Sequence, residues 1–262
     1  MKFASLFSLA AVSFILSSCL EIKSTIIANK DGTATIEEVT LLGAQLTAMM
    51  HVGGRQEAQI RGLVMDKPKA EERAKKLGEG VTVKSYEKLE MPDGRSGAKV
   101  VFAVPHLSKL HYLPFEPEQS SKTPTKKQPM TFALSGKTLT ITNPEADIKR
   151  SEGGSPQKDP EEMAHMKERL DMMRMAVQGM RITVEIKGEA GIASSDATHF
   201  KDGTISYLDI QFDKLTENAE VFAEVMESDD EGGTSMSDMA TRFNKVDGFK
   251  IEGKKVITAE LK

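Results

Sequence analysis

The chain has 262 residues, of which 35 are Lys or Arg and 39 are Asp or Glu, and its formal net charge is −4. This balance offers no basic surface to a polyanion, so we expect no nucleic-acid partner. Tryptophan is absent, aromatic residues make up 5% of the chain and there is one cysteine, which disfavours a carbohydrate module built on aromatic platforms and excludes an intramolecular disulfide.

The N-terminal segment is apolar and ends at that cysteine. Lys2 comes before an apolar stretch over residues 3–16, which is shorter than the roughly 18 residues of a membrane-spanning helix and suits the core of a signal peptide. Leu16-Ser17-Ser18-Cys19 follows. This order of a branched apolar residue, two small residues and a cysteine resembles the lipobox of bacterial lipoproteins. The alternative is an ordinary secretory signal with a coincidental cysteine.

The lipobox resemblance implies a cleaved signal peptide at residues 1–18 and a lipid attachment site at Cys19. In bacterial lipoproteins the cysteine thiol receives diacylglycerol, and the new amino terminus is acylated as well. Because one acyl chain anchors only marginally and two or more anchor stably, we expect a lasting attachment to a membrane of the cell envelope through acyl chains on Cys19. Leu20 stands where enteric lipoproteins of the inner membrane have Asp, which favours the outer membrane if the organism has one.

Residues 19–262 have the pattern of one extracytoplasmic domain rich in β-hairpins. Asp31-Gly32 lies between alternating runs, which is a strong hairpin signal, and Asp93-Gly94 and Lys201-Asp202-Gly203 separate strand-like runs in the same way. Further strands are predicted at residues 81–86, 98–104, 130–134, 138–142, 181–187 and 204–212, with a last hairpin formed by residue 251 and residues 256–261.

Helical periodicity and capping residues predict about four helices. Asp66 suits the N-cap of a helix over residues 70–77 that Gly78 would end, and Asp159-Pro160 begins a longer helix at residues 160–178. The other predicted helices cover residues 40–50 and 213–226, with a short one near residues 237–244. Loops are expected at residues 114–129, 143–158 and 228–236.

The fold class that we expect is α+β, with one or more antiparallel, hairpin-rich sheets and about four helices packed on one side. Lys30-Asp31-Gly32-Thr33 resembles Lys201-Asp202-Gly203-Thr204. The likeness is compatible either with two halves of similar design or with the chance recurrence of a short turn.

The 15 methionines are the strongest hint of a metal site, because several of them surround His165 and thioethers with an imidazole suit Cu(I). Their spacing favours packing instead. Steps of three and four residues place them on one apolar helix face together with a leucine and a valine. The residues of this face are Met163, Met166, Leu170, Met173, Val177 and Met180. We therefore expect no copper site.

No other pattern indicates catalysis or a cofactor. His106 and His111 are five residues apart, share no helix face and lack a third histidine, so a zinc site is not expected. The motifs Gly-x-Ser-x-Gly, Ser-x-x-Lys and His-Glu-x-x-His do not occur in a suitable setting. We expect no metal, no cofactor and no enzymatic activity, with an unrecognised enzyme as an alternative.

Several short motifs resemble those of uncharacterised bacterial envelope lipoproteins that include the LppM-type domains of mycobacteria. They are the turn Lys30-Asp31-Gly32-Thr33, the strand entry Gly78-Glu79-Gly80-Val81, the step Asp213-Lys214-Leu215 and, more weakly, residues 104–110. The resemblance implies an α/β domain that engages envelope lipids or glycolipids, and it brings no catalytic residues.

The sequence thus favours a membrane-anchored, non-enzymatic envelope lipoprotein that binds a lipid, a glycolipid or a protein partner. The main alternative is a structural or assembly subunit that docks onto a partner through the amphipathic, Met-rich helix at residues 160–178. Lipid binding predicts an apolar cavity lined by the methionine face, whereas docking predicts that this face is exposed.

Overall fold

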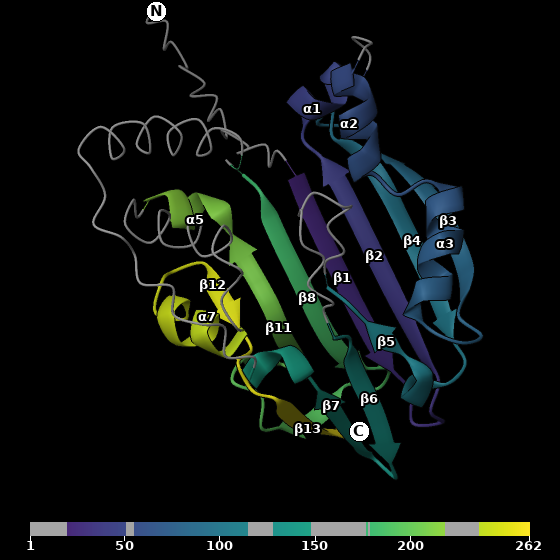
Figure 1. The fold of residues 1–262 in the computed structure, drawn as a ribbon, viewed down its shortest axis with the longest axis vertical. Coiled ribbons are helices and arrows are strands. Elements are labelled where there is room, and N and C mark those ends of the chain that lie inside the picture. Colours follow the sequence, from purple (N-terminus) through teal and green to yellow (C-terminus); the bar gives the residue numbers. More distant parts are fainter. Residues whose placement is uncertain (1–19, 51–54, 115–127, 148–176, 178, 218–235) are drawn as a thin grey trace, which may run out of the picture.

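The computed structural model describes residues 20–50, 55–114, 128–147, 177, 179–217 and 236–262 (Figure 1). These residues form a mixed α/β fold that consists mostly of two β-sheets, one of eight strands and one of five. The expectation of a sheet-rich fold with both strands and helices is confirmed. Cys19, the methionine face before Val177, and most of the predicted loops at 114–129, 143–158 and 228–236 lie outside the described residues.

The large sheet has the strand order β10-β11-β8-β1-β2-β4-β3, and β12 pairs with β11 as well. At its centre β1 pairs with β2 in antiparallel register and with β8 in parallel register. Its strands are β1 (Leu20–Ala28), β2 (Ala34–Leu42), β3 (Thr82–Glu90), β4 (Ser96–Val104), β8 (Arg181–Gly188), β10 (Phe200–Lys201), β11 (Thr204–Gln211) and β12 (Phe249–Ile251).

Each predicted Asp-Gly turn of this sheet is confirmed. In the first, the Asp31 carboxylate accepts hydrogen bonds from the Thr33 hydroxyl and backbone amide at 2.7 and 2.9 Å, and these bonds lower the pKa of Asp31. Gly32 has a φ of 83°, which glycine adopts without steric cost. The similar turns at Asp31-Gly32 and Asp202-Gly203 join hairpins of different length. β1 and β2 pair over their full lengths, whereas β10 contributes two residues. Their likeness is confined to the turn.

The small sheet has the order β5-β6-β7-β13-β9. The strands predicted at residues 130–134 and 138–142 are confirmed as β6 and β7, which pair as a hairpin. The predicted last hairpin is wrong, because β12 pairs with β11 in the large sheet and β13 pairs with β7 and β9 in the small one. The strands are β5 (His111–Tyr112), β6 (Met130–Ser135), β7 (Thr138–Thr142), β9 (Ile192–Ser195) and β13 (Val256–Leu261).

A buried carboxylate holds the chain where it passes from one sheet to the other. Glu252 is fully buried, and its oxygens accept hydrogen bonds from the backbone amide and hydroxyl of Thr198 at 2.6 and 2.9 Å and from the Lys254 amide at 3.0 Å. These bonds satisfy the carboxylate inside the protein. Ile251 and Ile257 are both fully buried, so the segment between them crosses from one sheet to the other instead of turning back.

The described helices are α1 (Ala44–Met49), α2 (Arg55–Leu63), α3 (Lys67–Leu77), α5 (Phe212–Glu217) and α7 (Met236–Phe243), with 3-10 turns η1 (Leu107–Lys109) and η2 (Pro144–Asp147). The predicted cap of α3 is confirmed, because the Asp66 carboxylate accepts from the Lys69 amide at 2.8 Å. The helix predicted at residues 40–50 starts only at Ala44, since Leu41 and Leu42 continue β2 opposite Gly97 and Ser96.

The packing of helices on one side is confirmed only in part. α3 and α7 bury Ala70, Ala74 and Leu77, and Ala240 and Phe243, in the common core. In contrast, α1 buries none of its residues. Figure 1 shows α1 and α2 beyond the end of β2 rather than across the sheet. The helix α2 lies beyond the helix predicted at residues 40–50, and no predicted element covers it.

One face of the large sheet carries the core. Ile26, Ile36, Val100, Phe102 and Ile186 lie on the same face of four neighbouring strands and are at most 1% exposed. The core continues into Phe132, Leu139, Ile141 and Ile257 of the small sheet. The small sheet therefore packs on this apolar face.

A charged pair interrupts the apolar face where α3 meets the sheet. The Arg73 guanidinium donates to Glu38 of β2 at 3.1 and 3.3 Å and to the Leu113 carbonyl at 2.9 Å, and it lies 5.5 Å from the ring centre of Tyr112. Burial raises the pKa of the Tyr112 hydroxyl. Since both charges are desolvated, their hydrogen bonds are needed to offset the cost of burial, and they position α3 over β2.

Two glycines provide a matched test of this packing. A Cβ added at Gly97 in β4 would come within 1.8 Å of the Thr40 carbonyl oxygen, whereas one added at Gly62 in α2 would meet nothing within 4 Å. We expect Gly97→Ala to lower the free energy of unfolding by about 1–3 kcal/mol through steric overlap. We expect Gly62→Ala to raise it by roughly 0.5–1 kcal/mol, because alanine is the better helix former. Urea denaturation of both variants measures the difference, and equal effects would contradict the close approach of β4 to β2.

Candidate functional site

The predicted lipid attachment site immediately precedes the large sheet. Cys19 lies outside the described residues, but β1 begins at the next residue, Leu20. Leu20 is opposite Leu42, the last residue of β2, and α1 follows after a single glycine. Because neighbouring strands are about 4.8 Å apart, the first residue of β1 lies close to the start of α1.

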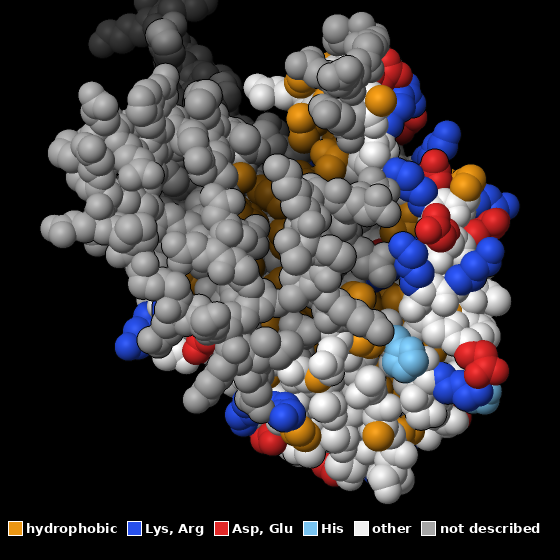
Figure 2. Space-filling model, viewed as in Figure 1, with side chains coloured by type: hydrophobic (Ala, Val, Ile, Leu, Met, Phe, Trp, Pro, Cys, Tyr) orange, Lys and Arg blue, Asp and Glu red, His pale blue; other side chains and the backbone are white. Residues whose placement is uncertain are grey.

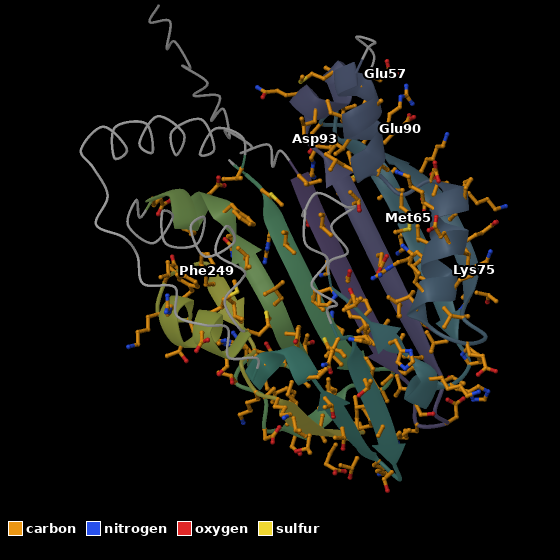
Figure 3. All side chains as sticks on the ribbon, viewed as in Figure 1. Glu57, Met65, Lys75, Glu90, Asp93 and Phe249 are labelled. Atoms are coloured by element: carbon orange, nitrogen blue, oxygen red, sulfur yellow. The ribbon has the colours of Figure 1, made fainter. Side chains whose placement is uncertain are left out.

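Three short elements meet at this end of the sheet, and we call them the sheet-end cap: α1, α2 and the β3–β4 turn at residues 91–95. The Thr47 hydroxyl of α1 is 3.0 Å from the Ser96 hydroxyl at the start of β4, and Arg61 of α2 donates to the Met50 carbonyl at 3.3 Å. A Cβ at Gly94 would be 3.3 Å from that of Ala44. The cap is thus one connected surface at the end of the sheet where β1 begins (Figure 3).

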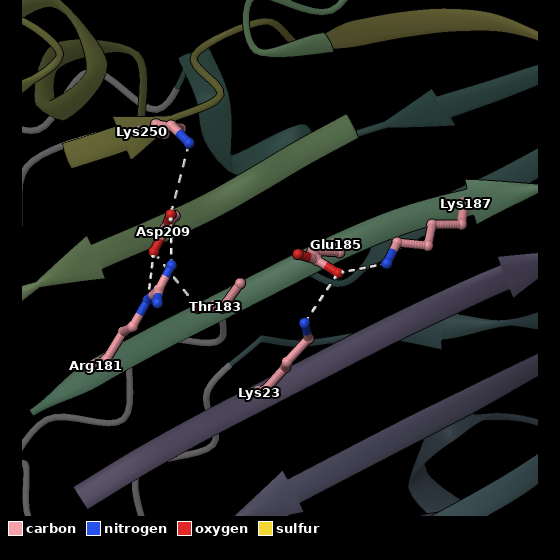
Figure 4. Close-up of polar contacts among 7 residues, drawn as sticks. All are labelled: Lys23, Arg181, Thr183, Glu185, Lys187, Asp209 and Lys250. Carbon is pink, nitrogen blue, oxygen red and sulfur yellow. Dashed lines mark hydrogen bonds and ion pairs between the residues drawn. The ribbon is translucent and has the colours of Figure 1, made fainter. Parts of the chain in front are cut away.

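The other face of the large sheet carries a charged network on its central strands (Figure 4). Asp209 of β11 is 6% exposed and receives a bidentate pair from Arg181 of β8, at 3.0 and 3.2 Å. The Thr183 hydroxyl lies 3.5 Å from the same carboxylate, and the Lys250 ammonium of β12 lies 3.7 Å from it. Asp209 therefore joins β11 to β8 and to β12 through ion pairs.

A second carboxylate lies further along β8. Glu185 contacts the ammonium groups of Lys187 at 2.8 Å and of Lys23 in β1 at 3.2 Å. Burial raises the pKa of Glu185, but the hydrogen bonds and positive charges of Lys187 and Lys23 outweigh it, so the pKa lies below its usual value. The carboxylate is held ionised and joins β1 to β8.

Four cationic side chains share two carboxylates in this network, which leaves an excess of two positive charges on a chain whose net charge is −4. Each cation is nevertheless paired across neighbouring strands or along β8. We therefore assign the network to strand pairing and not to ligand capture. Sequence reasoning missed it, although the alternating polar residues Arg181, Thr183, Glu185 and Lys187 show one polar face of β8.

An open hollow of about 510 Å³ lies between β11, β12 and the end of α7. Its lining includes Gln211, Asn244, Asp247 and Lys250 and is mostly polar. It does not match the apolar cavity that the sequence predicts for a lipid. The methionine face that would line such a cavity falls outside the described residues except for Val177 and Met180.

The two histidines considered for zinc are both exposed: His106 precedes η1 and His111 begins β5. Within the described ranges, no three His, Cys, Asp or Glu side chains are grouped as a metal site requires. None of the helices in those ranges is long and apolar enough to cross a membrane.

Comparisons with known proteins give one distant structural similarity. No protein-family model matches the chain, and no curated protein matches it. Among solved structures, the NMR structure of the folded domain of Mycobacterium tuberculosis LppM is similar with a TM-score of 0.35 and 10% identity, over 76% of this chain and 85% of that one. This similarity concerns the fold alone, and it is too low to assign a family or a function.

The ionised state of Glu185 predicts a pH-dependent contribution to stability. A carboxylate whose pKa is lowered by folding stabilises the protein above the unfolded-state pKa, which is about 4.3, and the contribution is lost as pH falls through the folded-state pKa. We expect Glu185→Gln to lower the free energy of unfolding at pH 7 by up to about 1 kcal/mol. The difference from the unaltered protein should shrink as pH falls below the unfolded-state pKa.

Urea denaturation at pH 7 and at pH 3 measures this effect. Glu87→Gln is the control, because Glu87 is an exposed glutamate on β3 and its replacement should change stability by less than about 0.5 kcal/mol. The same pH-dependent loss in both variants would show that Lys23 and Lys187 do not stabilise the Glu185 carboxylate.

Proposed function

We propose that this protein is a lipid-anchored, non-enzymatic lipoprotein of the cell envelope, attached through acyl chains on Cys19 and favouring the outer membrane. Its domain engages a lipid, a glycolipid or a protein partner at the membrane. The observation that carries the proposal is the sequence Leu16-Ser17-Ser18-Cys19 directly before β1. Cleavage before the cysteine would leave the folded domain intact, with the acylated residue at its first strand.

The position of the cysteine distinguishes this proposal from an ordinary secretory signal. A coincidental cysteine would be a free thiol directly before β1, and nothing would hold the protein on a membrane. An acylated cysteine would carry two or more chains, which anchor a protein stably. The two hypotheses therefore predict opposite fractionation of the same protein.

We expect Cys19→Ala to abolish incorporation of a labelled fatty acid and to release the protein from the membrane fraction. Metabolic labelling with an alkyne-tagged palmitate and fractionation of cells measure both effects. Ser18→Ala is the matched control, since it keeps a small residue in the lipobox and should preserve labelling and membrane retention. Unlabelled parent protein, or membrane retention of Cys19→Ala equal to that of the parent, would contradict lipid anchoring.

A further inference from the structure

An acylated Cys19 would leave the domain almost no freedom to move away from the bilayer. The anchor and the first residue of β1 are consecutive, and one residue spans at most about 3.6 Å. The end of the sheet at which β1 starts must then lie at the membrane surface. Because β1 and β8 are parallel, β8 starts at the same end, and β2 ends there.

The sheet-end cap occupies this end, and each of its three elements exposes one large apolar side chain. Leu63 of α2 is 47% exposed, and Met49 of α1 and Met91 of the β3–β4 turn are each 37% exposed. Scattered apolar residues on a surface are ordinary. Among the described residues, however, four large hydrophobic side chains are this exposed, and three of them belong to the cap.

The fourth exposed hydrophobic residue lies away from the cap. Val256 is 46% exposed and begins β13 in the small sheet, which lies at the opposite end of the molecule from α1 and α2 in Figure 1. Figure 2 shows hydrophobic side chains at the end where α1 and α2 lie. Three of the four exposed large hydrophobic side chains among the described residues thus lie where the anchor would hold the protein against lipid.

The charged side chains of the cap that the structure describes are paired. Arg61 contacts Glu57 at 2.7 Å, and Arg95 contacts Asp93 at 2.8 Å and Glu21 of β1 at 3.5 Å. Paired charges weaken any general attraction to anionic headgroups. Contact with a membrane would then depend on apolar side chains entering the lipid interface. The transfer of Met and Leu side chains from water to this interface has a favourable free energy.

We propose that the sheet-end cap is a bilayer-contact surface, with Met49, Leu63 and Met91 entering the lipid interface once Cys19 is acylated. This inference rests on the proposed lipid anchor. It adds that the domain has a fixed orientation, with the start of β1 toward the membrane and β13 away from it. The occupant of the surface is the lipid bilayer itself rather than a second protein.

Single-cysteine reporters test the orientation in the acylated, full-length protein. Acylation consumes the only native thiol, so Met49→Cys, Leu63→Cys and Met91→Cys can each be labelled with an environment-sensitive fluorophore. Val256→Cys is the matched control, being similarly exposed but outside the cap. The labelled proteins are placed in phosphatidylcholine vesicles with and without brominated acyl chains, which quench fluorophores that enter the lipid.

We expect the three cap reporters to lose about half of their fluorescence in brominated vesicles, because interfacial segments enter roughly 5–10 Å, and the Val256 reporter to lose none. Equal quenching at all four positions, or none at any, would overturn the fixed orientation. Reporters in the cap that are shielded from aqueous iodide but not quenched by lipid would identify a protein as the occupant and would also overturn the proposal.

A second measurement tests the proposed role of the cap independently of the proposed lipid anchor. Mass spectrometry of the N-terminal peptide reports acylation of Cys19, and its absence would overturn both the anchor and the cap. In acylated protein, the double variant Met49→Ser, Leu63→Ser should reduce quenching of the Met91 reporter at least about twofold, since two of three apolar contacts are lost. Unchanged quenching would overturn the cap and leave the anchor intact.

Discussion

The parallel pairing of β1 with β8 is the constraint on which the rest of this structure depends. It joins two segments more than 150 residues apart, with Glu21 opposite Arg181 and Ala28 opposite Gly188. The other strand pairs within the described residues are antiparallel. A parallel pair needs a long connection between its two strands. Here the connection from β1 to β8 includes β5, β6 and β7 of the small sheet. The hairpin at the N-terminus and the strands β11 and β12 are therefore joined in one sheet.

This pairing also determines which elements pack on each face of the sheet and which strand ends lie together. The apolar face receives α3 and the small sheet, and the opposite face carries carboxylates that are shared between neighbouring strands. Asp209 and Glu185 stabilise the register of β11, β8 and β1 because each is paired with cations from two positions. The strand starts of β1 and β8 coincide, so the residue before β1 and the sheet-end cap share one end. An anchored protein built this way would present that end to the membrane and its small sheet to the surrounding space.

The pair of Arg73 and Glu38, whose side chains are 13% and 12% exposed, shows how the sheet tolerates a charge on its apolar face. Glu38 occupies a position of β2 that points to the apolar face, where a carboxylate alone would be costly. The guanidinium on α3 satisfies it and also contacts Tyr112 and the Leu113 carbonyl. The alternation of β2 predicts the orientation of Glu38, but its partner lies 35 residues away on a helix whose placement no local pattern indicates.

The sequence by itself determined the features that depend on neighbours in the chain. The Asp-Gly turns, the Asp66 cap of α3 and the hairpin of β6 and β7 follow from backbone preferences and short-range hydrogen bonds. The pattern at Cys19 that resembles a lipobox is local too, so a lipid anchor can be proposed from it without a fold. Only the tertiary structure decided that β1 pairs with β8, that Leu41 and Leu42 extend β2, and that β12 and β13 enter different sheets. These choices depend on strand edges and buried side chains contributed by distant segments, because a strand's alternating pattern specifies which side faces the core but not which strand lies beside it.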